Sequence, residues 1–216
     1  MEVVSRRHWL THCSLGLCAA LSAAAGAATR RVVLVLGDSL SAEYGLPRGR
    51  GWVALLERRL EQEKLQARVV NASISGDTTS GGRSRLPALL DQHRPTHLVI
   101  ELGGNDALRG LPLAMTRDNL LAMTRAAKAA SARVLLTGMQ LPPNYGRSYA
   151  QEFAAMYGSV ARAEAVALVP FLLAGVADGP DADKMFQADR IHPVAEAHPR
   201  ILEAVWPVFK PWLIKS

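Results

Sequence analysis

Five short apolar runs recur along the chain, separated by longer segments in which apolar residues lie three and four positions apart. A short run rich in leucine or β-branched residues is typical of a buried strand, whereas the longer spacing predicts one face of a helix. Regular alternation of the two predicts an α/β fold, with a parallel sheet covered by helices on both faces. The expected strands are residues 32–36, 68–72, 97–102, 133–137 and 167–170.

Helical spacing predicts helices near residues 52–63, 83–93, 117–131, 149–164 and 195–209. Pro199 must fall in the first turn of the last helix, because a proline further inside would break it. The stretch 172–188 is rich in Gly, Pro and Asp, so we expect a long loop there. In an open parallel sheet, the loops that follow the strands share one edge, and ligands bind at that edge.

The first residues do not fit this pattern. Arg6 and Arg7 precede an apolar run of small residues from 15 to 25, which is the form of a secretory signal peptide. We therefore expect residues 1–28 to be a leader, cleaved at about 25–29, and residues 29–216 to be one domain in the periplasm or beyond it. The run is too short for a comfortable membrane span, so the mature chain should have none. The arginine pair leaves both the Sec and the twin-arginine route open.

Composition excludes several classes of function. Cys13 and Cys18 both lie in the leader, so the mature chain has no disulfide, catalytic thiolate or cysteine metal site. The net charge of +6 falls to +5 without the leader, and the basic residues are scattered rather than gathered with aromatics, which argues against nucleic-acid binding. We expect no metal and no cofactor. Nothing in the sequence demands an oligomer, so a monomer is expected.

Ser39 follows the first strand directly, within the sequence Gly-Asp-Ser-Leu-Ser at 37–41. Glycine allows a sharp turn, and a hydroxyl at the start of the next helix would face free backbone N–H groups. That environment suits a nucleophile whose transition state carries an oxyanion. Taken alone, the pentapeptide fits an ordinary turn with a helix cap equally well, and we interpret Asp38 as such a cap.

Three later loops should lie at the same edge of the sheet. Gly76, in the loop after the second strand, would let the backbone approach a ligand, and Asn105, after the third strand, offers an amide donor. Both residue types are also common in ordinary turns. The last loop carries Asp189 and His192, a carboxylate and an imidazole three residues apart.

Four histidines remain outside the leader, and a serine hydrolase needs one as its base. His93 and His97 flank the start of the third strand, at the edge opposite the ligand-binding loops, and His198 is expected on the last helix. His192 is therefore the candidate base, and Asp189 would fix its tautomer. Activity should rise with pH as His192 loses its proton.

These blocks together resemble the SGNH, or GDSL, hydrolases, in order and spacing, over about residues 32–209. The runs 71–78, 101–106, 108–110 and 141–146 resemble in particular the branch of periplasmic multifunctional acyl-CoA thioesterases, lysophospholipases and arylesterases. Glu43 departs from this branch, which often has a small residue there, and we expect it to influence substrate preference. His198 stands where glutamine is familiar.

The resemblance implies a flavodoxin-like three-layer αβα sandwich with a five-stranded parallel sheet. It implies Ser39, Asp189 and His192 as the catalytic residues and Ser39, Gly76 and Asn105 as the oxyanion hole. It also implies a groove for the acyl chain and a loop at 108–111 that shifts when the chain binds. The substrate-binding residues implied are Leu108, Arg109, Gly110, Leu111, Leu141, Pro142 and Tyr145, although the apolar ones could equally be packing residues.

The leading hypothesis is an exported serine esterase that cleaves acyl esters, thioesters and lysophospholipids through an acyl-enzyme intermediate. A sugar O-acetyl deacetylase of the same superfamily is an alternative and predicts a preference for acetyl groups. A catalytically silent acyl-chain-binding protein is a third hypothesis. The joint presence of Ser39, Asn105, Asp189 and His192 argues against it, because a binding protein needs no such set.

Overall fold

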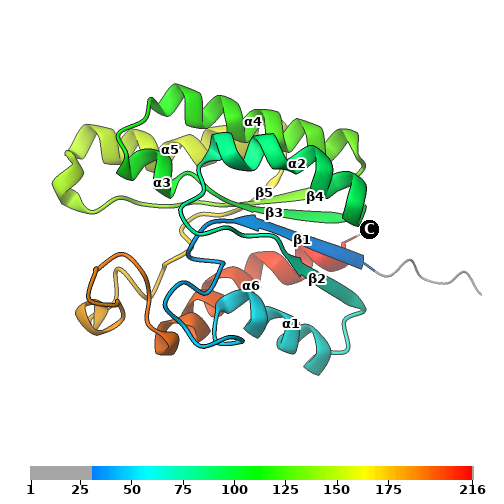
Figure 1. Cartoon of the computed structure of the whole chain (residues 1–216), viewed down its shortest axis with the longest axis horizontal. Helices are drawn as coiled ribbons and strands as arrows, with labels where there is room; N and C mark the ends of the chain where they lie inside the picture. Colours follow the sequence, from blue (N-terminus) through cyan, green and yellow to red (C-terminus); the bar gives the residue numbers. More distant parts are fainter. Residues whose placement is uncertain (1–30, 216) are drawn as a thin grey trace, which may run out of the picture.

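The protein forms a five-stranded parallel sheet between two layers of helices (Figure 1). The computed structural model describes residues 31–215, and the predicted leader, residues 1–28, lies outside them. All neighbouring strands pair in parallel in the order β2-β1-β3-β4-β5, so their carboxyl ends share one edge. The predicted α/β class is confirmed. The strands are β1 (Arg31–Gly37), β2 (Ala67–Asn71), β3 (His97–Glu101), β4 (Arg133–Thr137) and β5 (Ala167–Val169).

Helices α2, α3, α4 and α5 cover one face of the sheet, and α1 and α6 cover the other (Figure 1). The sandwich therefore has the three layers that the family resemblance implies. Short 3₁₀ turns occur at Pro143–Tyr145, Ala182–Lys184 and Ala195–Ala197. The helices are α1 (Trp52–Gln62), α2 (Thr79–His93), α3 (Gly104–Leu108), α4 (Leu113–Ala129), α5 (Arg147–Glu164) and α6 (His198–Ile214).

Helix boundaries differ from the prediction in three places. Both α2 and α4 begin four residues early; α2 starts where the Thr78 side chain accepts a hydrogen bond from the N–H of Gly81. The short helix α3 was not expected, because five residues carry no readable period. Helix α6 continues to Ile214 despite Pro207 and Pro211, which both lie on its exposed side. Pro199 lies in its first turn, as predicted.

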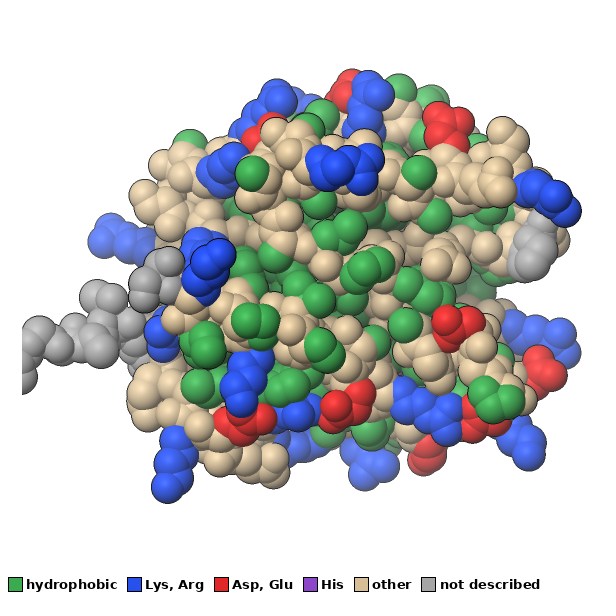
Figure 2. Space-filling model, turned by 180° about the vertical axis from the view of Figure 1, so that it is seen from behind, with side chains coloured by type: hydrophobic (Ala, Val, Ile, Leu, Met, Phe, Trp, Pro, Cys, Tyr) green, Lys and Arg blue, Asp and Glu red, His purple; other side chains and the backbone are tan. Residues whose placement is uncertain are grey.

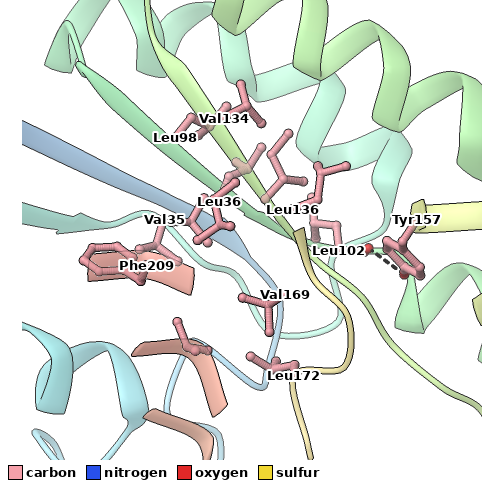
Figure 3. Packing of buried hydrophobic residues seen from close by; sticks show 14 of the residues in the cluster. Val35, Leu36, Leu98, Leu102, Val134, Leu136, Tyr157, Val169, Leu172 and Phe209 are labelled. Atoms are coloured by element: carbon pink, nitrogen blue, oxygen red, sulfur yellow. Dashed lines mark hydrogen bonds between the residues drawn. The ribbon is translucent and has the colours of Figure 1, made fainter. Parts of the chain in front are cut away.

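The core lies on both faces of the central strands (Figure 3). The side chains of β1 from Val33 to Leu36 are fully buried, and those of β3 are almost fully buried. Such uninterrupted apolar runs are typical of parallel strands that are covered on both sides. Tyr157 of α5 donates a hydrogen bond to the carbonyl of Leu102 at 3.0 Å, which anchors the helix to the chain leaving β3.

An aromatic contact lies at the edge of the sheet opposite the carboxyl ends of the strands. His97, at the start of β3, packs edge-on against Trp212 of α6, with ring centroids 4.8 Å apart. Its position away from the ligand-binding loops agrees with the prediction. Within residues 31–215, no helix combines the length and apolar character needed to cross a membrane.

Candidate active site

Ser39 leaves the carboxyl end of β1 in a single tight turn. The carbonyl of Asp38 accepts hydrogen bonds from the N–H groups of Ser41, at 3.2 Å, and Ala42, at 2.9 Å. The expectation that a helix starts at Ser39 is wrong, because residues 39–45 form turns and α1 begins only at Trp52. Gly45 has φ +71°, a conformation that cannot continue into a right-handed helix.

The side chains of Ser39, His192 and Asp189 are hydrogen-bonded in series. His192 Nε2 lies 2.8 Å from Ser39 Oγ, and His192 Nδ1 lies 2.7 Å from Asp189 Oδ2. With the carboxylate holding Nδ1–H, the unprotonated Nε2 faces the hydroxyl and can accept its proton. The structure thus brings together the three residues that the sequence singled out.

Asp189 is held as a carboxylate by the turn that carries it. Its Oδ1 accepts hydrogen bonds from the N–H groups of Ile191 and His192, at 2.9 and 3.0 Å. Partial burial acts to raise the pKa of Asp189, but these hydrogen bonds and the His192 ring prevail and lower it to about 2. The turn needs a residue in the left-handed conformation between Asp189 and His192, and Arg190 adopts this conformation with φ +57°.

Gly76 and Asn105 lie in the loops that follow β2 and β3, the two strands on either side of β1. Gly76 has φ +78°, a conformation that favours glycine, and its carbonyl accepts a hydrogen bond from Arg109 at 2.8 Å. The amide of Asn105 donates to Asp38 Oδ2 at 2.9 Å. Asn105 and Ser39 both line the same cavity. The loops after β1 and β3 therefore meet at the cavity, whereas Gly76, in the loop after β2, is not part of its lining.

A half-buried arginine fixes the loop that carries Gly76. Arg85 of α2 donates to Asp77 Oδ2 at 2.8 Å and also to the carbonyls of Ala72 and Gly37. Asp77 thus braces the loop through Arg85, and Arg85 also ties the loop to β1. The position of Gly76 relative to Ser39 depends on this arginine.

An apolar cavity of about 510 Å³ opens beside Ser39. Ser39 and His192 stand in its wall, and most of the other lining is aliphatic or aromatic. A largely apolar cleft of this kind suits an acyl chain. Its apolar lining consists of Leu40, Leu108, Met139, Leu141, Pro142, Phe153, Phe171, Leu173, Ala177, Phe186 and Ile191.

The predicted groove is only partly correct. Leu108, Leu141 and Pro142 line the cavity, whereas Arg109, Gly110, Leu111 and Tyr145 are not part of its lining. Arg109 instead holds the carbonyl of Gly76, and the carbonyl of Leu111 accepts a hydrogen bond from Tyr149 at 3.3 Å. Helix α3 and the turn after it direct these side chains away from the cavity.

Several residues at the site escaped prediction. The ring of Tyr44 packs on His192 with centroids 4.3 Å apart, and Gln187 donates its backbone N–H to the carbonyl of His192 at 2.7 Å. Phe186 lines the cavity from the stretch 172–188 that is expected to be a long loop, and Phe171 lines it from the position just before that stretch. An exposed tyrosine and apolar residues within an aperiodic stretch carry no signal of their spatial neighbours.

Glu43 and His198, the two departures from the family pattern, hold the fold near the site. The carboxylate of Glu43 accepts from the N–H groups of Gly49, at 3.0 Å, and Gly51, at 2.7 Å. Neither residue lines the cavity, so nothing in the structure ties Glu43 to substrate preference. His198 is buried and accepts the N–H of Trp52 at 3.0 Å, which joins α6 to α1.

Charges on the protein surface are dispersed. Figure 2 shows Lys and Arg side chains spread over the visible face with acidic side chains among them. Within residues 31–215, no three His, Cys, Asp or Glu side chains are grouped so as to hold a metal ion. The polar groups hydrogen-bonded at the site are the Ser39 hydroxyl, the His192 imidazole and the Asp189 carboxylate.

An open parallel sheet with a serine, a histidine and an aspartate hydrogen-bonded in series at its carboxyl edge is an arrangement that also occurs in serine hydrolases. The chain belongs to the GDSL-like Lipase/Acylhydrolase family, whose pattern matches residues 35–200. It is an ester-hydrolysing enzyme of this family, as its relatives are.

Two curated relatives are similar over most of their length. The chain is 53% identical over 196 residues to Esterase TesA of Pseudomonas aeruginosa, and this alignment covers 91% of this chain and 96% of the relative. It is 44% identical over 177 residues to Thioesterase 1/protease 1/lysophospholipase L1 of Escherichia coli, which covers 82% of each chain. The predicted family is thereby confirmed.

Solved structures have the same fold. The crystal structure of TesA superposes with a TM-score of 0.81 at 54% identity, covering 84% of this chain and 99% of that one. The psychrotrophic esterase EstA from Pseudoalteromonas sp., inhibited by monoethylphosphonate, superposes with a TM-score of 0.79 at 39% identity, covering 85% and 98%.

Proposed function

We propose that the enzyme hydrolyses acyl esters and thioesters, including lysophospholipids and aryl esters, through a covalent acyl intermediate on Ser39. The observation that carries this proposal is the hydrogen-bonded series Ser39, His192, Asp189 at the mouth of an apolar cavity. The relatives named for esterase, arylesterase, thioesterase and lysophospholipase activity support the substrate classes.

In the first half-reaction, Ser39 Oγ attacks the acyl carbonyl carbon while His192 Nε2 takes the hydroxyl proton. The tetrahedral intermediate collapses when the bond to the leaving oxygen or sulfur breaks, and His192 returns the proton to that atom. In the second half-reaction, a water oxygen attacks the acyl carbonyl carbon while His192 takes a proton from the water. The bond to Ser39 Oγ then breaks, Oγ takes the proton from His192, and the fatty acid is released. Asp189 stabilises the imidazolium in both halves.

The oxyanion of each tetrahedral intermediate would be bound by three donors. These are the backbone N–H groups of Ser39 and Gly76 and the side-chain amide of Asn105, which come from the loops after β1, β2 and β3. Such donors lower the barrier because they are already oriented before charge develops on the oxygen.

The cavity favours chains longer than acetyl. Its volume of about 510 Å³ and its aliphatic and aromatic wall would be largely empty around an acetyl group. Burial of each methylene group contributes about 0.8 kcal/mol to the binding free energy, so several methylenes outweigh the other differences in binding between acyl esters. This argues against the sugar deacetylase alternative.

The test is a series of p-nitrophenyl esters from acetate to palmitate, measured with the wild type and Ser39→Ala. We expect activity that peaks at medium or long chains and is lost in the variant. Mass spectrometry after treatment with an alkyl phosphonate should find one adduct on Ser39. Activity on acetate alone would support the deacetylase, and no serine-dependent activity would support a binding protein.

We also propose that residues 29–216 act as an exported monomer after removal of the leader. Mass spectrometry of the protein from the periplasmic fraction should give a mature start between residues 25 and 29. Sedimentation should give the mass of one chain. A protein that keeps its leader, or a dimer at micromolar concentration, would contradict the proposal.

A further inference from the structure

Two carboxyl groups are buried side by side beneath the nucleophile. Asp38 follows β1 directly, and Glu101 ends β3 opposite Gly37 in the parallel register. Their residues are 3% and 1% exposed, and no cation lies within ion-pair distance of either in the described part of the chain. Two neighbouring carboxylates cannot both keep their charge in such surroundings. One of the pair must carry a proton.

The hydrogen bonds of Glu101 show where that proton lies. Trp52 Nε1 donates to the hydroxyl of Ser41 at 3.1 Å, so the hydrogen of that hydroxyl is free to point to Glu101 Oε2 at 2.7 Å. The N–H of Asp38 points to the same oxygen at 3.2 Å. Oε2 is thus an acceptor only. Oε1 is buried and has no partner among the described residues, so it is the oxygen that can hold a hydrogen.

The hydrogen bonds of Asp38 indicate the opposite state. Its Oδ1 accepts the N–H of Leu40 at 3.0 Å, and its Oδ2 accepts an N–H of Asn105 at 2.9 Å. Both oxygens are acceptors, which suits a carboxylate. The planar amide of Asn105 has a second hydrogen that points away from Asp38, and this hydrogen remains available on the side of the cavity.

We propose that Glu101 is a positioning residue, whose neutral carboxylic acid lets Asp38 stay ionised so that Asp38 orients the amide of Asn105 toward the oxyanion. The inference rests on the proposed function, because it acts through the oxyanion hole. A charged Glu101 would repel Asp38 and loosen its hold on Asn105. A missing Glu101 would leave the Ser41 hydroxyl and the Asp38 N–H without an acceptor.

The electrostatics of the surrounding groups agree with this assignment. Burial, and then the charge of Asp38, raises the pKa of Glu101 well above its ordinary value. Burial also raises the pKa of Asp38, to about 6, against the lowering effect of its hydrogen bonds and of His192. Tyr157 of α5 is the other titratable group that senses the pair, and its pKa is raised by burial and by Glu101.

The test compares Glu101→Gln with Glu101→Met in two backgrounds, the wild type and Asn105→Ala. Glutamine keeps the shape of the neutral acid, with one oxygen acceptor and one NH2 group as donor, whereas methionine keeps only the length. Glu164→Met is the matched control. Glu164 is also a buried glutamate, but it lies at the end of α5 and pairs with Arg125 and Lys128. The readouts are kcat and KM on p-nitrophenyl butyrate, with the folded fraction measured by urea unfolding.

We expect Glu101→Gln to keep kcat within about 3-fold of the wild type from pH 6 to 9, because it cannot ionise. Glu101→Met should lower kcat by roughly 10- to 100-fold with little change in KM, which is less than the complete loss of an oxyanion donor. In the Asn105→Ala background, the same Glu101→Met change should alter kcat by less than about 2-fold, since the residue it acts through is gone. Glu164→Met should leave kcat unchanged.

Two results would overturn the proposal. If Glu101→Gln is as impaired as Glu101→Met, the ionised carboxylate is the required form. If Glu101→Met costs the same factor in both backgrounds, the residue supports only the fold. Should the methionine variant fail to fold, Asp38→Asn provides the second test: it removes the charge at constant size and should lower kcat only while Asn105 is present. Absence of Ser39-dependent hydrolysis in the wild type would instead reject the proposed function.

Discussion

His192 Nε2 lies 2.8 Å from Ser39 Oγ, although 153 positions separate the two residues in the chain. Ser39 is carried by the loop after the central strand β1, whereas His192 lies in the segment between β5 and α6. The packing of α6 against α1 brings these parts together, and the hydrogen bond from Trp52 N–H to His198 fixes the contact near the site. The geometry of the reacting pair therefore depends on a tertiary contact between early and late parts of the chain.

Asp189→Asn should lower kcat on p-nitrophenyl butyrate by roughly 10³- to 10⁴-fold, because asparagine favours the wrong tautomer of His192 and does not stabilise the imidazolium. KM should change little. Asp91→Asn, on the exposed side of α2, is the control and should be fully active. Because the pKa of Asp189 is about 2, its protonation should not limit wild-type activity at any pH above about 4. A loss smaller than 10-fold would contradict the role given to Asp189.

Ala177→Phe should shorten the range of acyl chains accepted, since Ala177 lines the cavity and a phenyl ring there would occupy space for the tail. We expect kcat/KM on the palmitate ester to fall by at least about 10-fold relative to the acetate ester, the equivalent of losing contacts to about two methylenes. Ala163→Phe, exposed on α5, is the size-matched control. Equal effects on short and long esters would show that the chain does not pass Ala177.

The central sheet could be predicted because the burial of its strands is visible in the sequence as apolar runs. Residues 33–36 and 98–100 are buried on both faces, so these apolar runs have no polar interruption. The reacting side chains could be predicted for a related reason: each follows a strand at the carboxyl edge or stands in a short, distinctive block. Asp38 and Glu101 escaped, because a carboxylate next to a serine or at a strand end gives no sign of burial until the strand register is known.

The cavity was harder to predict, because it is made of side chains from segments without a period. Leu108 lies on a five-residue helix, and Phe171 and Phe186 lie in stretches dominated by turns. Which side of such a segment faces the substrate is decided by individual hydrogen bonds, such as that from Arg109 to the carbonyl of Gly76. Hydrophobic periodicity contains no information about bonds of this kind.

Arg85→Met should destabilise the protein by about 2 to 3 kcal/mol, because it leaves the half-buried Asp77 carboxylate and two backbone carbonyls without their donor. Urea unfolding measures the change. Arg117→Met is the control, since the exposed pair that Arg117 forms with Asp118 contributes less than about 1 kcal/mol. Equal stability of the two variants would show that Arg85 does not hold the loop of Gly76.

His97 should make the protein less stable in mild acid. Burial, and then Arg133 and Arg31, lowers the pKa of His97 to about 4, from 6.5 when it is unperturbed. Between these values the unfolded chain binds a proton that the folded protein does not, so the free energy of unfolding decreases as the pH falls from about 6.5 to 4, by up to about 3 kcal/mol. Within residues 31–215, Nε2 of this ring has no partner that would stabilise the charged form.

The measurement is urea unfolding of wild type and His97→Gln at pH 7 and at pH 4.5. The loss of stability between the two pH values should be smaller in the variant by about 1 to 2 kcal/mol. Asp38 and Glu101 have raised pKa values and act in the opposite direction, but they are present in both proteins and cancel in the difference. His93→Gln, at the end of α2, should behave like the wild type. Parallel pH profiles for wild type and His97→Gln would rule out His97 as the source.

Ser39 precedes His192 in the chain, and this order affects a polypeptide whose synthesis or folding is incomplete. A ribosome has made Ser39, Gly76 and Asn105 long before it reaches the histidine, and the segment that carries the histidine needs α6 to pack on α1. An unfinished or truncated chain therefore has a hydroxyl without a base. Under the proposed mechanism, hydrolysis of acyl esters can begin only after α6 has packed against α1.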